Sequence, residues 1–153
     1  MPSEKKDLEF SASTSTRFKA ANSAKIKVLC VDDNSLRLYL TGILLEHQDD
    51  CLVVKTTTSA TDALSRLSSE AFDAVVCDFE MPEMDSLEFL EQLRSTGNMI
   101  PFIILTGHNG EEIVTRAMNL AVKHFINKSE NLKSLFSALA RAIISEVDGN
   151  RAA

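Results

Sequence analysis

Hydrophobic residues fall into two alternating patterns along this chain. Short runs rich in valine, isoleucine and leucine have the composition of strands that are buried on both faces of a sheet. Between these runs, apolar residues recur at the three- and four-residue spacing of an amphipathic helix. The runs predict strands at residues 25–31, 52–56, 74–78, 100–106 and 123–127.

A helix is expected after each strand, and capping signals mark three of the helix starts. In a capping box, a small polar residue is followed three positions later by an acidic residue that closes the first turn. The pairs are Ser59 with Asp62, Asp85 with Glu88, and Asn109 with Glu112. The first helix is expected at about 35–46, the second ends near 69, and the fourth ends near 119. The last helix carries an apolar stripe, residues 132–143, that covers the sheet or, alternatively, forms a partner surface.

Regular alternation of strand and helix predicts an α/β fold. We expect a flavodoxin-like, doubly wound five-stranded parallel sheet with strand order 2-1-3-4-5 and helices on both faces. The folded domain is expected at residues 25–148. Residues 1–24 have mixed charge and a Ser/Thr-rich run, which is typical of a flexible tail, and 149–153 are expected to form a C-terminal tail.

Composition narrows the class of protein. A hydrophobic share of 44% and a charged share of 25% are ordinary for one soluble domain of 153 residues. The net charge of −6 argues against direct binding to nucleic acid. No apolar run reaches the roughly 20 residues of a membrane span, and the polar N-terminus is no signal peptide, so a cytoplasmic location is expected. Cys30, Cys51 and Cys77 have no metal-ligand spacing and are interpreted as reduced core residues.

Polar side chains follow four of the predicted strands at the point where each strand ends. The first strand runs into Asp32 and Asp33, the third ends in Asp78, the fourth in Thr106, and the fifth leads into Lys128. In a doubly wound sheet these ends meet in one crevice, where ligands bind. Crowded carboxylates need a cation, and oxygen ligands suit Mg²⁺, which shields an incoming phosphoryl group from a carboxylate nucleophile. Lys128 is expected to pair with Asp78.

Each of these residues also has an ordinary structural explanation. A single aspartate at a strand end is commonly a cap or a turn residue. Thr106 has a side chain that favours strands, and Lys128 is consistent with a surface charge. The joint occurrence of these types at four strand ends is what favours a phosphoryl site.

Four segments, in this order, resemble the receiver domain of two-component response regulators. They are VLCVDDN, VVCDFEMPEMDSLEFL, PFIILTG and HFINK. The resemblance covers residues 25 to about 146, and the PFIILTGHNGEE stretch is similar to receivers of archaeal signalling proteins. The chain ends soon after the last predicted helix, so we expect a stand-alone receiver that is not an enzyme beyond its own phosphorylation and dephosphorylation.

The resemblance assigns roles to the acidic residues. It implies that Asp78 is the phosphoacceptor, phosphorylated by a histidine kinase or a phosphotransfer domain in a reaction that requires Mg²⁺. It implies that Asp32 and Asp33 hold the ion together with Asp78 and the backbone carbonyl of Glu80.

The resemblance also implies which residues bind the phosphoryl group and change position when it arrives. Thr106 and Lys128 are expected to bind the phosphoryl oxygens, and Phe125 matches the aromatic residue that rotates as Thr106 moves. The Glu80 side chain and His108 are expected to tune the lifetime of the acyl phosphate, although His108 is equally consistent with an exposed loop residue. Excess apolar surface on the first helix, Leu38 in particular, is expected to dock the phosphodonor protein or simply to pack.

Output is expected through protein–protein contact at the 110–120 helix, the last strand and the last helix, a surface that also allows a homodimer. The downstream protein target is not identified by the sequence. Two alternatives remain: a phosphorelay intermediate that passes the phosphoryl group on, and, more remotely, an aspartate-nucleophile phosphatase. Such phosphatases usually have a second aspartate where this chain has Glu80.

Overall fold

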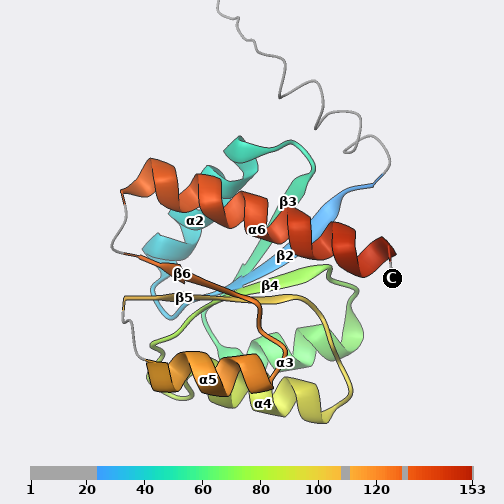
Figure 1. Cartoon of the computed structure of the whole chain (residues 1–153). Helices are drawn as coiled ribbons and strands as arrows, with labels where there is room; N and C mark the ends of the chain where they lie inside the picture. Colours follow the sequence, from blue (N-terminus) through green and yellow to red (C-terminus); the bar gives the residue numbers. More distant parts are fainter. Residues whose placement is uncertain (1–23, 108–110, 129–130, 153) are drawn as a thin grey trace, which may run out of the picture.

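The computed structural model describes residues 24–107, 111–128 and 131–152 of the chain. Strands and helices alternate throughout this part (Figure 1). In chain order the elements are β2 (Ile26–Val31), α2 (Ser35–Gln48), β3 (Leu52–Thr57), α3 (Ala60–Ser69), β4 (Ala74–Asp78), α4 (Ser86–Ser95), β5 (Phe102–Thr106), α5 (Glu111–Asn119), β6 (His124–Asn127) and α6 (Leu132–Ala152).

The strands form one parallel sheet in the order β3-β2-β4-β5-β6, which is the predicted order 2-1-3-4-5. Helices α2 and α6 cover one face of the sheet, and α3, α4 and α5 cover the other (Figure 1). The doubly wound architecture is therefore confirmed, and with it the placement of all strand C-termini at one edge.

Alternate residues of each strand supply two separate cores. In β2, Val28 and Cys30 pack with α2 and α6, whereas Leu29 and Val31 pack with the helices of the opposite face. Successive strand side chains point to opposite faces, so a strand covered on both sides is apolar at every position. This explains why the buried strands show no polar alternation in the sequence.

Two predicted caps fall on the described chain. Asp85 and Glu88 form the full reciprocal box at the start of α4. Ser59 accepts from the Asp62 amide as predicted, but the Asp62 carboxylate accepts from the Thr57 hydroxyl at 2.7 Å. The same Thr57 hydroxyl accepts a hydrogen bond from the Ser59 amide. Thr57 therefore links the Ser59 amide to the Asp62 carboxylate, where a full capping box has a direct hydrogen bond. The predicted cap at Asn109 lies outside the described residues.

The C-terminal end of the domain differs from the sequence prediction. Residues 149–152, expected as a tail, continue α6 to Ala152. Arg151 fixes this last turn, because it donates to the backbone oxygen of Lys25 at 2.8 Å and pairs with Asp73 at 3.2 Å. Because these contacts are polar, the sequence of this segment has no apolar periodicity that would predict a helix. The predicted tail at 1–24 lies, except for Ala24, outside the described residues.

Two further observations concern the cysteines and the hydropathy of the helices. Cys30, Cys51 and Cys77 are buried and form no disulfide with one another, and burial raises the pKa of the Cys30 thiol to about 12. Over residues 24–107, 111–128 and 131–152, no helix has both the length and the hydropathy of a bilayer span.

Candidate functional site

The structure brings the predicted polar residues to one edge of the sheet. Asp32 follows β2, Asp78 ends β4, Thr106 ends β5 and Lys128 follows β6. Backbone hydrogen bonds fix these ends side by side: the Lys128 amide donates to the Thr106 oxygen, and the Phe79 amide donates to the Leu105 oxygen. The site is therefore positioned by the register of the central strands.

The three aspartates form one acidic cluster. Asp32, Asp33 and Asp78 each offer a carboxylate oxygen within 4.8 Å of the others. Asp78 is only 2% exposed and Asp32 9%, whereas Asp33 faces solvent. The strand geometry thus holds one carboxylate deep in the protein and leaves another at the surface.

In the described part of the chain, the side chain of Asp78 accepts a hydrogen bond through one of its two oxygens. The Lys128 ammonium group donates to Oδ1 of Asp78. Oδ2 of Asp78 is buried and has no hydrogen-bond partner within the described part of the chain. A buried carboxylate oxygen without a donor is costly unless a cation or a donor arrives. The all-oxygen donor set and this unpartnered oxygen fit a hard divalent ion such as Mg²⁺.

The two buried carboxyls have opposite pKa shifts. Burial raises the pKa of Asp78 above its ordinary value, and Lys128 reverses only part of that increase. Burial also acts on Asp32, but hydrogen bonds from Arg37 and from the Asn34 amide outweigh it and lower the pKa of that carboxyl. Opposite shifts on neighbouring acids are common at functional sites, since each environment stabilises a different protonation state.

Arg37 is a member of the site that the sequence analysis did not include. Its guanidinium binds Asp32 through two hydrogen bonds, from Nε at 3.0 Å and from Nη2 at 2.8 Å. Nη2 also lies 3.6 Å from Asp33 Oδ1 and 4.0 Å from Asp78 Oδ2. The only sequence signal is its position in the first turn of α2, four residues after Asp33.

The two residues of the switch hypothesis, Thr106 and Phe125, lie on the neighbouring strands β5 and β6. Thr106 is buried at the end of β5, in the strand next to Asp78. Phe125 of β6 is opposite Ile104 in the register and packs, half-buried, against the core under α3, α4 and α5. The register thus places Thr106 at the end of the strand next to Asp78, whereas the switch role and the movement of either residue remain predictions.

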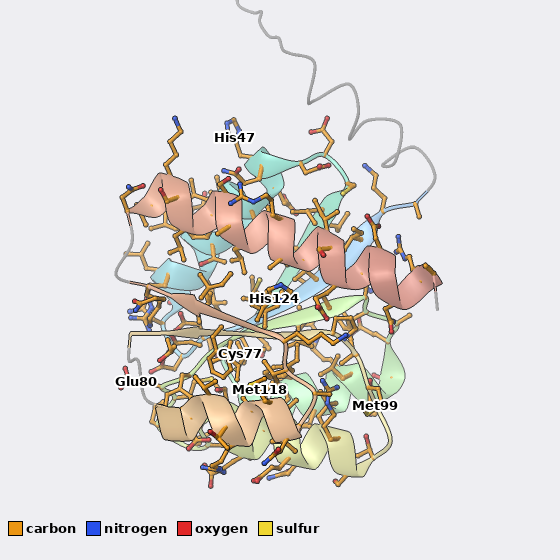
Figure 2. All side chains as sticks on the ribbon, in the orientation of Figure 1. His47, Cys77, Glu80, Met99, Met118 and His124 are labelled. Carbon is orange, nitrogen blue, oxygen red and sulfur yellow. The ribbon has the colours of Figure 1, made fainter. Side chains whose placement is uncertain are left out.

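Of the two residues expected to tune the lifetime of the acyl phosphate, only Glu80 is among the residues that the structure describes. Glu80 is exposed at the edge where the strands end (Figure 2). The role of its backbone carbonyl as a metal ligand remains a prediction. His108 lies outside the described residues.

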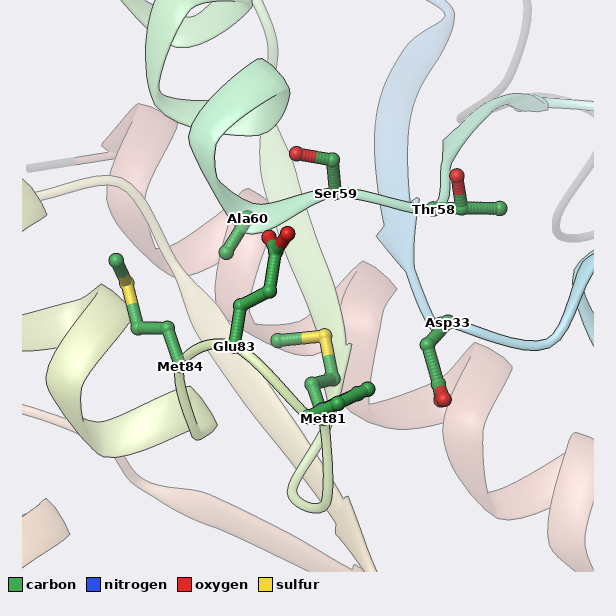
Figure 3. Close-up of a pocket in the computed structure, with 8 residues that line it drawn as sticks. Asp33, Thr58, Ser59, Ala60, Met81, Glu83 and Met84 are labelled. Atoms are coloured by element: carbon green, nitrogen blue, oxygen red, sulfur yellow. The ribbon is translucent and has the colours of Figure 1, made fainter.

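A hollow of about 240 Å³ opens beside the acidic cluster (Figure 3). Asp33 lies on one side of it, and the loop after β4 contributes Met81 and Glu83 (Figure 3). The loop after β3 contributes Thr58 and Ser59. This hollow gives small solutes a route to Asp33, and its acidic rim favours cations over free anions.

The expected docking residue Leu38 is in the wrong place for that role. It is 4% exposed and belongs to the core beneath α2 and α6. The apolar side chains that α2 does present to solvent are Leu36, Tyr39, Leu40 and Ile43, each between 46% and 65% exposed. The surplus of apolar surface on this helix is therefore real, but it lies on a different face.

Comparisons with known proteins identify the family of this fold. A family model described as the response regulator receiver domain matches residues 28–140. A protein-glutamate methylesterase/protein-glutamine glutaminase of Chromohalobacter salexigens is 37% identical over 110 residues, covering 71% of this chain and 31% of the relative. The equivalent protein of Paraburkholderia xenovorans is 34% identical, covering 80% of this chain and 37% of the relative. The chain thus spans about a third of the length of these curated relatives.

Solved structures agree with the family model. A response regulator receiver domain protein from Clostridium thermocellum is similar with a TM-score of 0.72 and 25% identity, covering 82% of this chain and 97% of that structure. The chemotaxis protein CheY4 of Vibrio cholerae is similar with a TM-score of 0.68 and 25% identity, covering 78% and 99% of the two chains.

Proposed function

This chain belongs to the response regulator receiver family, and from that premise we propose that it is a phosphorylation switch in which Asp78 is the phosphoacceptor. The phosphodonor is a histidine kinase or a phosphotransfer domain. One observation supports the proposal above all: Asp78 is buried at the end of β4, Lys128 binds one of its oxygens, and two further aspartates each offer a carboxylate oxygen within 4.8 Å.

The transfer step follows from this geometry. An oxygen of the Asp78 carboxylate attacks phosphorus, the bond from phosphorus to the donor nitrogen breaks, and the bonding electrons leave with the imidazole. Lys128 stabilises charge on the transferred group as it forms, and Thr106 donates a hydrogen bond to another of its oxygens. The product is an acyl phosphate on Asp78.

The residues that hold Mg²⁺ in this proposal are Asp32, Asp33, Asp78 and the backbone carbonyl of Glu80. The unpartnered Oδ2 of Asp78 and the clustered carboxylates support the assignment. When bound, the ion supplies positive charge that offsets repulsion between the phosphoryl group and the carboxylates.

Phosphorylation is proposed to act on partners through β5, β6 and the helices that follow them. A phosphoryl group adds charge and strong acceptor oxygens at Asp78, which draws Thr106 and Lys128 inward. Phe125, packed beneath α5, then changes its position. Val114 and Met118 are exposed on α5 and offer apolar contacts for a downstream protein or a second copy of the chain.

The exposed face of α2 is proposed as the docking surface for the phosphodonor protein. Leu36 and Tyr39 lie on the first turns of this helix, close in sequence to the acidic cluster. A hollow of about 490 Å³ lies beside Tyr39, between α2 and the end of β3. A helix of the partner that packs here would bring its phosphohistidine to the site.

The proposal concerns the receiver unit and its own chemistry, namely phosphorylation and dephosphorylation of Asp78. The methylesterase and glutaminase activities named for the relatives describe those proteins. A receiver in this chain is compatible both with an independent switch and with a regulatory unit that controls an effector.

Intact-mass spectrometry tests the proposal. The protein is incubated with a small acyl phosphodonor in Mg²⁺ or in excess chelator, and Asp78→Asn serves as the variant. We expect the mass of one phosphoryl group on the wild type with Mg²⁺ only, and none on Asp78→Asn. Equal modification of the variant would contradict the assignment. Asp50→Asn, which changes an exposed carboxyl, is the matched control and is expected to behave as wild type.

A further inference from the structure

Arg37 lies within ion-pair distance of every carboxylate of the acidic cluster. Its guanidinium forms a two-point contact with Asp32 and lies within ion-pair distance of Asp33 and Asp78. A planar guanidinium that binds both oxygens of a carboxylate is a strong, directional partner. The cluster therefore already contains a fixed positive charge supplied by the protein itself.

The local structure at the start of α2 builds this contact. Asn34 caps the helix by accepting from the Arg37 amide at 2.9 Å, and the Asn34 amide donates to Asp32 Oδ1 at 2.9 Å. Oδ1 of Asp32 thus receives two donors, and Oδ2 receives the Arg37 Nε. Both oxygens of Asp32 therefore already accept hydrogen bonds, and a metal ion would compete with Arg37 for them.

The charge balance favours replacement of the Arg37 guanidinium by a divalent ion over the presence of both cations at the cluster. Asp32, Asp33 and Asp78 carry three negative charges, and Lys128 and Arg37 carry two positive ones. A divalent ion added to this arrangement would leave a net positive cluster, whereas replacement of Arg37 by the ion gives neutrality. Cations that share one small, partly buried site repel each other strongly.

We infer that Arg37 is the resident counter-ion of the metal-free site, and that Mg²⁺ binds through Asp32 only when the guanidinium leaves. This inference rests on the proposed Mg²⁺ site. Arg37 is a positioning residue here: it keeps the clustered carboxylates compatible in the absence of metal, and it lowers the affinity of the site for the ion. Its side chain is 49% exposed, so it can rotate into solvent without opening the core.

Calorimetric titration with Mg²⁺ tests the inference on wild type, Arg37→Ala and Arg37→Lys. We expect Arg37→Ala to bind Mg²⁺ about tenfold more tightly than wild type, because no competing cation has to be displaced. The Mg²⁺ affinity of Arg37→Lys should lie between those of the other two proteins, since lysine keeps the positive charge but cannot make the two-point contact with Asp32. Arg141→Ala, on the exposed side of α6, is the matched control and should bind as wild type.

A second measurement follows the side chain of Arg37 in the wild type itself. The Nε–H signal of Arg37 in the wild type, assigned by its loss in Arg37→Lys, reports directly on the contact with Asp32. Saturating Mg²⁺ should move this signal to the position and rapid solvent exchange of a free arginine. An Nε–H that stays hydrogen-bonded at saturation overturns the inference, as does an Arg37→Ala affinity equal to or below that of wild type.

The two proposals fail in different ways. Absence of Mg²⁺ binding in both wild type and Arg37→Ala would contradict the proposed metal site and this inference together. Equal Mg²⁺ binding by both proteins, abolished in each by Asp78→Asn, would leave the metal site in place and remove the role of Arg37.

Discussion

Asp78 is held in an environment that does not favour its charge. Its carboxyl is buried, one oxygen lacks a hydrogen-bond partner in the described part of the protein, and burial raises its pKa. The native state therefore binds a proton at this residue more readily than the unfolded state does. Linkage then requires that the Asp78 contribution to stability falls as pH rises from the ordinary carboxyl pKa through the raised one.

Asp78→Asn is expected to be more stable than the wild type at neutral pH, by about 1 kcal/mol, since it removes a poorly compensated buried charge. The gain should disappear as pH falls below the ordinary carboxyl pKa, where Asp78 is protonated in both states. Urea unfolding across this pH range, without Mg²⁺, measures the difference. Asp50→Asn corrects for the loss of one negative charge, and an Asn variant less stable than wild type at neutral pH would contradict the account.

At the scale of single residues, the sequence predicted the site wherever strand register alone decides position. Asp32, Asp78, Thr106 and Lys128 each end or follow a strand, so their meeting point follows from the sheet. Arg37 was missed because an arginine on a helix is usually a solvated charge. The direction of the Arg37 side chain depends on the residue at which α2 begins, which the Asn34 cap sets. The hydrophobic pattern of the strands carries no information about that residue.

At the scale of elements, α2 shows the limit of hydrophobic patterning. Leucine and isoleucine surround this helix, so periodicity does not identify which face is buried. Packing against α6 decides it: Leu38 and Leu45 enter the core, whereas Tyr39 and Ile43 remain exposed. Capping boxes were more informative, since the Asp85–Glu88 pair depends only on local spacing.

Ile43→Asp is expected to slow phosphoryl transfer from a donor protein at least about tenfold, because a charge in the docking face removes apolar contact. Phosphorylation by a small acyl phosphodonor should be unchanged, since the acidic cluster is intact. Rates measured side by side with both donors make the comparison. Leu132→Asp, which places the same charge at another exposed apolar residue at the start of α6, is the control. Equal slowing with both donors would indicate damage to the site rather than to docking.

At the scale of the whole molecule, the layers connect the site with a distant surface. Helices α3, α4 and α5 cover one face of the sheet and α2 and α6 the other, so β5 and β6 are shared by the site and the proposed output face (Figure 1). The alternation of strand and helix predicted this arrangement. The length of α6 was not predicted, because its last turn is held by the polar contacts of Arg151.

A phosphate mimic such as beryllofluoride, added with Mg²⁺, is expected to shift amide signals across residues 106–128. The reason is that Thr106 and Lys128 respond to the new acceptor oxygens and carry β6 with them. Signals from α3, on the opposite side of the site from β6, should move less. Shifts confined to residues next to Asp78 would contradict the proposed route to the output face, and Asp78→Asn should show none of them.

The most direct test of the central claim is to locate the phosphoryl group chemically. Borohydride reduces an acyl phosphate to the alcohol, so phosphorylated aspartate becomes homoserine at the same position. After incubation with Mg²⁺ and a phosphodonor, peptide sequencing by mass spectrometry should find homoserine at position 78 and at none of the other acidic positions, with no conversion in chelator. Homoserine at another aspartate, or conversion at position 78 that is independent of Mg²⁺, would contradict the account.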